Sequence, residues 1–336
     1  MNSIHSKLHP FVLAAIGCFL FCHPNHGVWS QIVLSPDYPH VCHMTNMEAF
    51  IALKGGKQTL VLEAKYAFET KKDVYGRPLV PESDDSVLDP PKKLAWIVPV
   101  PPDSQPAAIE TGSLMGDLFD LTHPSTKAKY HLRTGRPQGI TRFGGSIFTG
   151  GVSDEEEPLK WSWIEPSSDA VQKLRDLLTR EGLAFPESSP VQDYVEKGWK
   201  IGVGILEEPG IAGVLGPFAV EFSSETAVLP LRFQSQAGEF SLSVYVLSDK
   251  ILDHRAISQW DMRGINPWEN LHREAWFRGY VAVADMEIPE SVKPIVEAMA
   301  GGSLENLSFY AWEGKDYNGY GRTTERFKQD FSIPAK

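Results

Sequence analysis

The stretch Met47-Glu-Ala-Phe-Ile-Ala-Leu-Lys-Gly-Gly-Lys-Gln-Thr-Leu-Val-Leu-Glu-Ala-Lys-Tyr-Ala-Phe68 contains the clearest structural pattern in this chain. Its first part, Met47–Leu53, is apolar, and Gly55-Gly56-Lys57 has the composition of a hairpin turn. From Leu60 to Phe68, large apolar side chains recur at every second position, which is the period of a half-buried strand. The stretch therefore predicts a β-hairpin and indicates a fold built on antiparallel strands.

Further strand patterns follow this hairpin. The apolar segment Leu94–Val98 is followed by Pro99, which is expected to end it because proline cannot donate to a central ladder. Later strands are predicted at residues 280–284 and 307–312. Four others are spaced like an antiparallel meander, at residues 200–206, 218–222, 228–233 and 239–247.

Helical patterns lie between the strand blocks, at residues 111–122, 169–181 and 190–198, and one more occurs at 289–300. In the clearest, 169–181, Ser168 is the expected N-cap and Gly182 the expected stop. Strict βαβ alternation is missing, so we predict the α+β class. The expected architecture is a mainly antiparallel sheet, open or folded into a sandwich, with two or three helices inserted at residues 111–198.

The first thirty residues have the features of a secretory signal peptide. Lys7 precedes the uncharged apolar run Phe11–Cys22, and compact residues lead to an expected cleavage near Ser30. This run is shorter than the roughly 20 residues that span a bilayer. We therefore expect an exported protein that is secreted or, in a bacterium, periplasmic after cleavage. A lipoprotein acylated at Cys18 is the less favoured reading, because Ala15 occupies a position where leucine is expected.

The rest of the chain is large, acidic and poor in cysteine. The 336 residues carry a formal net charge of −11 and are 42% hydrophobic, and residues 1–30 hold one lysine and no acid. An acidic chain repels phosphate, which argues against nucleic-acid binding and against docking on anionic lipids. No later run reaches membrane-spanning length. Cleavage would leave Cys42 as the single thiol, which excludes an internal disulfide.

The expected organisation is a signal peptide (residues 1–30), a main α+β domain (31–255) and a Trp-rich C-terminal extension (256–336). The extension either packs on the main domain or forms a small subdomain. Oligomeric state is not predicted by any pattern.

Several blocks, taken in order, resemble a bacterial family known as domain of unknown function 2330. They are Ala52–Leu60, Leu94–Pro101 with its Val-Pro-Val-Pro end, Tyr194–Trp199, Leu229–Phe233 and Leu242–Val246. The resemblance covers about residues 42–250 and implies export and a shared fold. It implies no activity, ligand or catalytic residue, since the family has none assigned.

One segment contains residue types that bind metals. His40, Cys42, His43 and Met44, with Met47 nearby, offer imidazole, thiolate and thioether groups, which suit copper or zinc. A loop could direct them at one ion, whereas a strand would point Cys42 and His43 to opposite faces. A metal-handling protein is therefore one candidate, and a surface segment with a partly buried thiol is the alternative. We predict no other cofactor.

Signals for catalysis are weak. Gly144-Gly-Ser146 and Gly301-Gly-Ser303 lack the second glycine of a nucleophile elbow. No His-Glu-x-x-His pair and no nucleotide-binding glycine motif occurs. Carboxylates are plentiful, and two of them facing across a cleft could support glycoside hydrolysis. A secreted hydrolase with a site of dispersed carboxylate and histidine residues thus remains an alternative.

Aromatic residues gather near the C-terminus. Trp312, Tyr317 and Tyr320 lie close to Asp316 and Asn318, and these five residues are the predicted binding site. Aromatic rings beside polar groups suit a sugar polymer or a protein partner, although aromatic residues in a strand also serve as core. Trp161-Ser-Trp163 allows the same two interpretations. The favoured function is an exported, non-catalytic module of the bacterial envelope that binds a polymer or protein partner.

Overall fold

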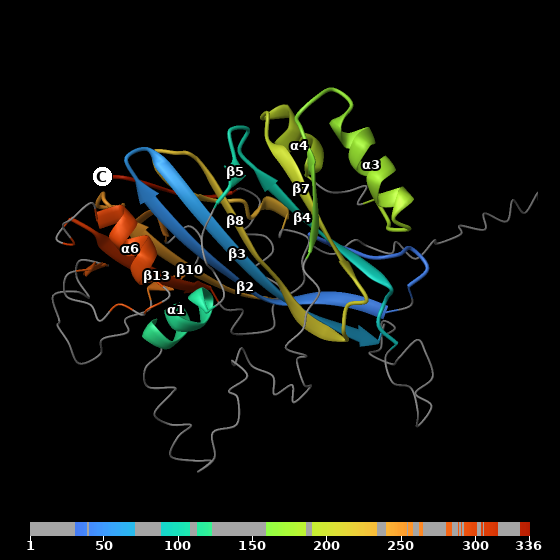
Figure 1. The fold of residues 1–336 in the computed structure, drawn as a ribbon, viewed down its shortest axis with the longest axis horizontal. Coiled ribbons are helices and arrows are strands. Elements are labelled where there is room, and N and C mark those ends of the chain that lie inside the picture. Colours follow the sequence, from blue (N-terminus) through green and yellow to red (C-terminus); the bar gives the residue numbers. More distant parts are fainter. Residues whose placement is uncertain are drawn as a thin grey trace, which may run out of the picture.

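A computed structural model shows a large β-sheet packed face to face against two smaller sheets, with helices on both outer faces (Figure 1). It describes residues 31–38, 40–70, 89–107, 113–122, 159–185, 190–233, 240–253, 255–257, 262–264, 280–283, 292–300, 306–314 and 330–336, and the single positions 288, 290 and 304. Everything below concerns these residues. The predicted α+β class, with mainly antiparallel strands, is confirmed.

The larger sheet has eight strands, in the order β11-β13-β10-β2-β3-β8-β5, with β12 also paired to β13. Their bounds are β2 (His40–Lys54), β3 (Lys57–Thr70), β5 (Gln105–Pro106), β8 (Ala212–Ser223), β10 (Ser241–Ser248), β11 (Arg263–Gly264), β12 (Val281–Ala282) and β13 (Ser308–Gly314). The predicted hairpin, β2 with β3, forms the centre of this sheet. The apolar run from Met47 to Leu53 is buried on both faces, as expected for a central strand.

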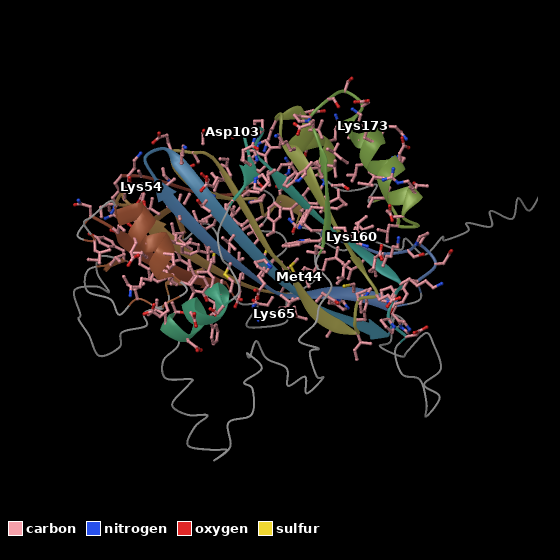
Figure 2. The ribbon with its side chains drawn as sticks, in the orientation of Figure 1. Met44, Lys54, Lys65, Asp103, Lys160 and Lys173 are labelled. Atoms are coloured by element: carbon pink, nitrogen blue, oxygen red, sulfur yellow. The ribbon has the colours of Figure 1, made fainter. Side chains whose placement is uncertain are left out.

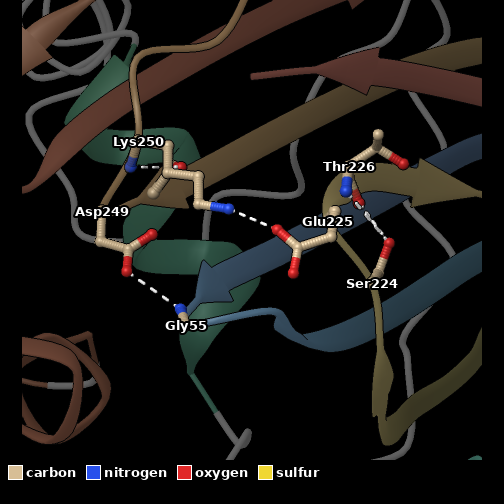
Figure 3. Close-up of polar contacts among 7 residues, drawn as sticks. Gly55, Ser224, Glu225, Thr226, Asp249 and Lys250 are labelled. Atoms are coloured by element: carbon tan, nitrogen blue, oxygen red, sulfur yellow. Dashed lines mark hydrogen bonds and ion pairs between the residues drawn. The ribbon is translucent and has the colours of Figure 1, made fainter. Parts of the chain in front are cut away.

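The turn of this hairpin is as tight as its glycines predict. Lys54 pairs with Lys57, and Gly55 and Gly56 have φ angles of 56° and 76°. Two successive positive φ values are the requirement of a two-residue hairpin turn, and glycine meets it without steric cost. The Gly55 N–H donates to Asp249 Oδ2 at 2.9 Å, which ties the turn to the end of β10 (Figure 3).

The predicted meander at residues 200–247 is wrong. The four segments do form strands, but β7 (Lys200–Glu207) joins a second sheet, β8 pairs with β3, and β9 (Thr226–Leu229) pairs with β14 (Phe331–Pro334). Strand β10 lies parallel to β2, from Ser241 opposite Asn46 to Ser248 opposite Leu53. Even spacing along the chain cannot reveal such pairings, because each strand finds a partner far away in the sequence.

Two smaller sheets face the larger one. One has the order β1-β4-β7-β6 and contains β1 (Ile32–Val33), β4 (Lys93–Val100), β6 (Lys160–Ile164) and β7 (Lys200–Glu207). The other pairs β9 (Thr226–Leu229) with β14 (Phe331–Pro334). Strand β4 continues through Pro99 to Val100, two residues beyond the expected end. Because β1 pairs only with Ala95 and Trp96, the missing N–H of Pro99 costs no ladder bond to β1.

Helices cover the two outer faces (Figure 1). Helices α1 (Leu114–Thr122) and α6 (Lys293–Ala300) pack on the larger sheet, while α3 (Ala170–Arg180) and α4 (Val191–Glu196) pack on the β4–β7 sheet. The N-cap of α3 is Asp169 rather than the predicted Ser168, and it makes no side-chain capping bond. Gly182, at φ 75°, follows the end of α3 as predicted. None of the described helices has the length and apolar content needed to cross a membrane.

The core divides into three layers that follow this arrangement. The largest lies between the sheets, a second lies under α1 and α6, and the third lies under α3 and α4. Met44, labelled in Figure 2, belongs to the layer between the sheets. Gln58 of β3 is fully buried: its Nε2 donates to the Val228 carbonyl at 2.6 Å, and its Oε1 accepts from the Val228 N–H at 2.8 Å. This amide therefore fastens β9 to the central hairpin.

Candidate functional site

The predicted aromatic site is described only in part. Trp312, in β13, is 2% exposed and stacks on Tyr310 with 5.3 Å between ring centroids. On its other side lies Phe331 of β14, at 6.2 Å. Trp312 is therefore part of the core between the sheets and does not present its ring to a ligand. The other four predicted residues, Asp316, Tyr317, Asn318 and Tyr320, lie outside the described residues.

The predicted metal segment is a strand rather than a loop. Cys42 and Met44, 5% and 2% exposed, point into the core between the sheets, and alternation sends His43 to the other face. Burial raises the pKa of the Cys42 thiol well above its ordinary value, which disfavours the thiolate that a metal needs. Within the described ranges, no group of three or more His, Cys, Asp or Glu side chains could hold a metal ion.

His40, the remaining predicted ligand, borders a surface cleft of about 480 Å³. The cleft is formed by the segment before β2, the segment that enters β4 and the C-terminal end of α3. It is lined by Ser35, Asp37, Tyr38, His40, residues 89–93 and residues 181–183. The sequence pointed to one of these residues only, because the three segments are far apart in the chain.

Tyr38 is the best-anchored side chain in this cleft. Its hydroxyl donates to the Asp89 carbonyl at 2.9 Å, and its ring meets those of His40 and Phe68 edge-on, each at 5.4 Å between centroids. Burial, with smaller effects from Cys42 and Asp89, raises the pKa of Tyr38 to about 12. The hydroxyl therefore stays protonated and serves as a hydrogen-bond donor.

The charges at the other wall of the cleft are paired. Lys93 Nζ donates to Glu181 Oε2 at 2.9 Å and lies 3.8 Å from Glu207. The hydrogen bond and charge of Lys93 lower the pKa of Glu181, which keeps this carboxylate ionised. The other carboxylates that line the cleft are those of Asp37 and Asp89.

A second surface is aromatic. In β6, Trp161 and Trp163 project from the same face, and their rings are stacked at 6.2 Å with an interplanar angle of 22°. Phe218 of β8 packs against both indoles. Its ring centroid lies 4.5 Å from that of Trp161 and 5.9 Å from that of Trp163. Trp163 is 38% exposed, and β6 is the last strand of its sheet within the described structure. We call the two indoles the Trp161–Trp163 platform.

Glycines on the neighbouring strand make room for this platform. Trp161 and Trp163 lie opposite Gly204 and Gly202 of β7 in the strand register. A Cβ added at Gly204 would stand 3.0 Å from Trp161, and one added at Gly202 would stand 3.2 Å from Trp163. Both contacts are closer than carbon atoms normally approach. The indoles can therefore lie across β7 only because these positions are glycine.

Charged groups stand at the Trp163 end of the platform. Glu165 follows β6 and pairs with Lys200 at the start of β7, at 3.3 Å. Asp103, labelled beside β5 in Figure 2, accepts a 2.8 Å hydrogen bond from the Ser223 N–H. Hydrogen bonds from Ser223, with a smaller effect of Lys200, lower the pKa of Asp103, so it is ionised at neutral pH. The sequence signal, Trp-Ser-Trp on one strand, was present but could not be told apart from a core strand.

The fold and these surfaces define an α+β protein in which a large sheet packs against two smaller ones. The chain matches the model of the DUF2330 family, described as an uncharacterized protein conserved in bacteria, over residues 86–331. Because this is more than half of the chain, the protein belongs to that family. The matched range starts after the hairpin that was expected to open it, and it includes most of the Trp-rich C-terminal part that was expected to lie outside.

Other comparisons add little. Among curated proteins, no sequence matches this chain at a significant level. Among solved structures, the crystal structure of baculovirus P35 is similar with a TM-score of 0.38 and 9% identity, covering 88% of this chain and 97% of that one. A TM-score this low does not define a shared fold.

Proposed function

We propose that this protein is an exported, non-catalytic module that binds a polysaccharide of the bacterial envelope through the Trp161–Trp163 platform. The observation that carries the proposal is the platform itself. Two indoles lie side by side on an end strand, and Trp163 is 38% exposed although its ring is large and apolar. Soluble proteins usually bury such rings or use them for binding.

The chemistry of the platform suits a sugar ring. A pyranose has an apolar C–H face, which packs on an indole, and a rim of hydroxyl groups, which need hydrogen-bond partners. The indoles of Trp161 and Trp163 supply the flat apolar area, and the paired Glu165 and Lys200, which come next along β6 and β7, supply charged partners at the Trp163 end. Charged acceptors and donors form the stronger class of hydrogen bonds.

The platform is also held rigidly, which reduces the entropy lost on binding. Trp161 touches Trp96 in the core, at 5.9 Å between centroids, and Phe218 supports it from the opposite sheet. Gly202 and Gly204 keep the space beneath the rings open. An indole that is fixed before the ligand arrives loses little side-chain freedom.

Export is supported by the sequence features of residues 1–30. Lys7 precedes the uncharged apolar run Phe11–Cys22, and compact residues lead to an expected cleavage near Ser30. An acidic chain also fits a polymer ligand that is neutral rather than polyanionic.

The proposal is tested by co-sedimentation of the protein with insoluble peptidoglycan, chitin and cellulose. Trp163→Ala should weaken binding to the preferred polymer about tenfold, since an aromatic contact of this kind contributes on the order of 1–1.5 kcal/mol. Ile251→Ala is the matched control, because Ile251 is a large apolar side chain with 39% exposure. Near-UV circular dichroism verifies that both variants fold. Equal binding by Trp163→Ala and wild type would reject the platform as the site.

A hydrolase acting at the cleft is the second candidate. The observation that favours it is that Asp37, Asp89 and His40 line one cleft, which is the arrangement that dispersed catalytic residues require. The same polymers, incubated with the protein, should then release soluble saccharides, and Asp37→Asn or Asp89→Asn should abolish the release. Binding without any release would leave the non-catalytic module as the better account.

A further inference from the structure

Gln31 is buried more completely than its polarity predicts. It has no exposed surface, and its side chain lies against β4, where Oε1 accepts a 3.0 Å hydrogen bond from Trp96 Nε1. Its main-chain carbonyl accepts from the Ile97 N–H at 2.8 Å. The other side-chain atom, Nε2, is buried without a hydrogen-bond partner. Leaving a buried donor unsatisfied is unfavourable, because the group gives up its hydrogen bonds to water and gains none in return.

Export would bring an amine next to this side chain. If the signal peptide is removed after Ser30, as the proposed function requires, Gln31 becomes the N-terminal residue, and its α-amino group lies within reach of its own side-chain amide. Ile32 and Val33, which follow Gln31, are both buried in the core.

We infer that Gln31 is cyclised to pyroglutamate in the mature protein, and this inference rests on the proposed export. The α-amino nitrogen attacks the side-chain carbonyl carbon, Cδ, and forms a new C–N bond. The bond from Cδ to Nε2 then breaks, and Nε2 leaves as ammonia with the proton that the attacking amine gives up. The reaction is an internal amide exchange, so it needs no oxidant, reductant or second substrate.

The product removes the unsatisfied donor. The atom that leaves is Nε2, the one that lacks a partner, and the amine becomes a neutral lactam nitrogen. The oxygen that remains on the lactam is Oε1, the atom that accepts from Trp96. Cyclisation is expected before folding, while the new chain end is still free, because the folded protein encloses Gln31 completely.

The test is intact-mass and N-terminal analysis of the protein. The full chain, residues 1–336, is expressed in a Gram-negative host and purified from the periplasmic fraction. The expected mass is that of a chain starting at Gln31 less one ammonia. Edman degradation should be blocked, and pyroglutamyl aminopeptidase should release the block only after the protein is denatured. Gln31→Asn is the matched control, since its side chain is too short to close the five-membered lactam, and it should retain the full mass.

Each failure has its own signature. A periplasmic protein with a free amine on Gln31 would overturn the pyroglutamate inference while leaving export intact. A mature chain that starts at another residue would also overturn it. A chain that keeps residues 1–30 and stays in the cytoplasm would contradict export itself.

Discussion

Gly204→Ala is the substitution that best tests how the Trp161–Trp163 platform is built. The added Cβ would stand 3.0, 3.1 and 3.2 Å from three atoms of the Trp161 indole, Cζ2, Cη2 and Cε2. Carbon atoms in contact normally lie about 3.5–4.0 Å apart, so the ring must move by roughly half an ångström. Such overpacking costs about 1–3 kcal/mol.

The cost is partly offset, because alanine loses less backbone freedom than glycine in a strand. This gain is roughly 0.5–1 kcal/mol. In wild type, Gly204→Ala should therefore lower the free energy of unfolding by about 1 kcal/mol. When Trp161 is first replaced by leucine, the indole that would clash with the new Cβ is absent, so only the gain from the reduced backbone freedom of alanine remains. The same substitution should then stabilise the protein by about 0.5–1 kcal/mol.

The assay is urea unfolding of the four proteins in this double-mutant cycle, followed by circular dichroism. Gly264→Ala is the control, because a Cβ at Gly264 would meet no atom within 4 Å. It should give the same small effect in both backgrounds. If Gly204→Ala changes stability equally with and without the indole, within the roughly 0.5 kcal/mol limit of additivity, then Trp161 does not lie on Gly204 and the account of the platform is refuted.

Two further predictions concern the core. Gln58→Ala should lower the free energy of unfolding, measured with urea, by about 2–4 kcal/mol. The reason is that the substitution leaves both the N–H and the carbonyl of Val228 without their side-chain partner. A loss below about 0.5 kcal/mol would contradict this role. Burial raises the folded-state pKa of Cys42, so the contribution of Cys42 to stability should be constant below about pH 8.5, the ordinary thiol pKa, and fall above it by at most about 1.4 kcal/mol per pH unit. Comparing unfolding at neutral and alkaline pH checks this, and an identical pH dependence in Cys42→Ala would count against it.

Local patterns were sufficient for the individual elements. Alternation from Leu60 to Phe68, with Gly55 and Gly56 before it, predicted the central hairpin, and the apolar face of residues 169–181 predicted α3. These signals are local, because the period of side chains and the φ angles of glycine are properties of a few consecutive residues. The DUF2330 resemblance was likewise visible in short blocks of sequence, although the matched range proved different.

Pairing between distant strands was not accessible in the same way. Residues 200–247 read as a meander, yet β10 lies parallel to β2 and β7 belongs to a different sheet. Every one of these segments is compatible with several partners by its pattern alone. Which pairing is adopted depends on how all the sheets bury their faces together, and this is a property of the whole chain.

The sequence by itself determined the class of fold, the central hairpin, the main helices and the presence of two groups of aromatic residues. Only the tertiary structure decided that Trp312 is core and that Trp163 lies at the surface. Trp312 and Trp163 both lie in short aromatic strands, but Phe331 of β14 packs against Trp312, whereas Trp163 lies on the end strand β6 and stays 38% exposed. The physical reason is that burial depends on what packs above a side chain, and that neighbour comes from a distant part of the chain.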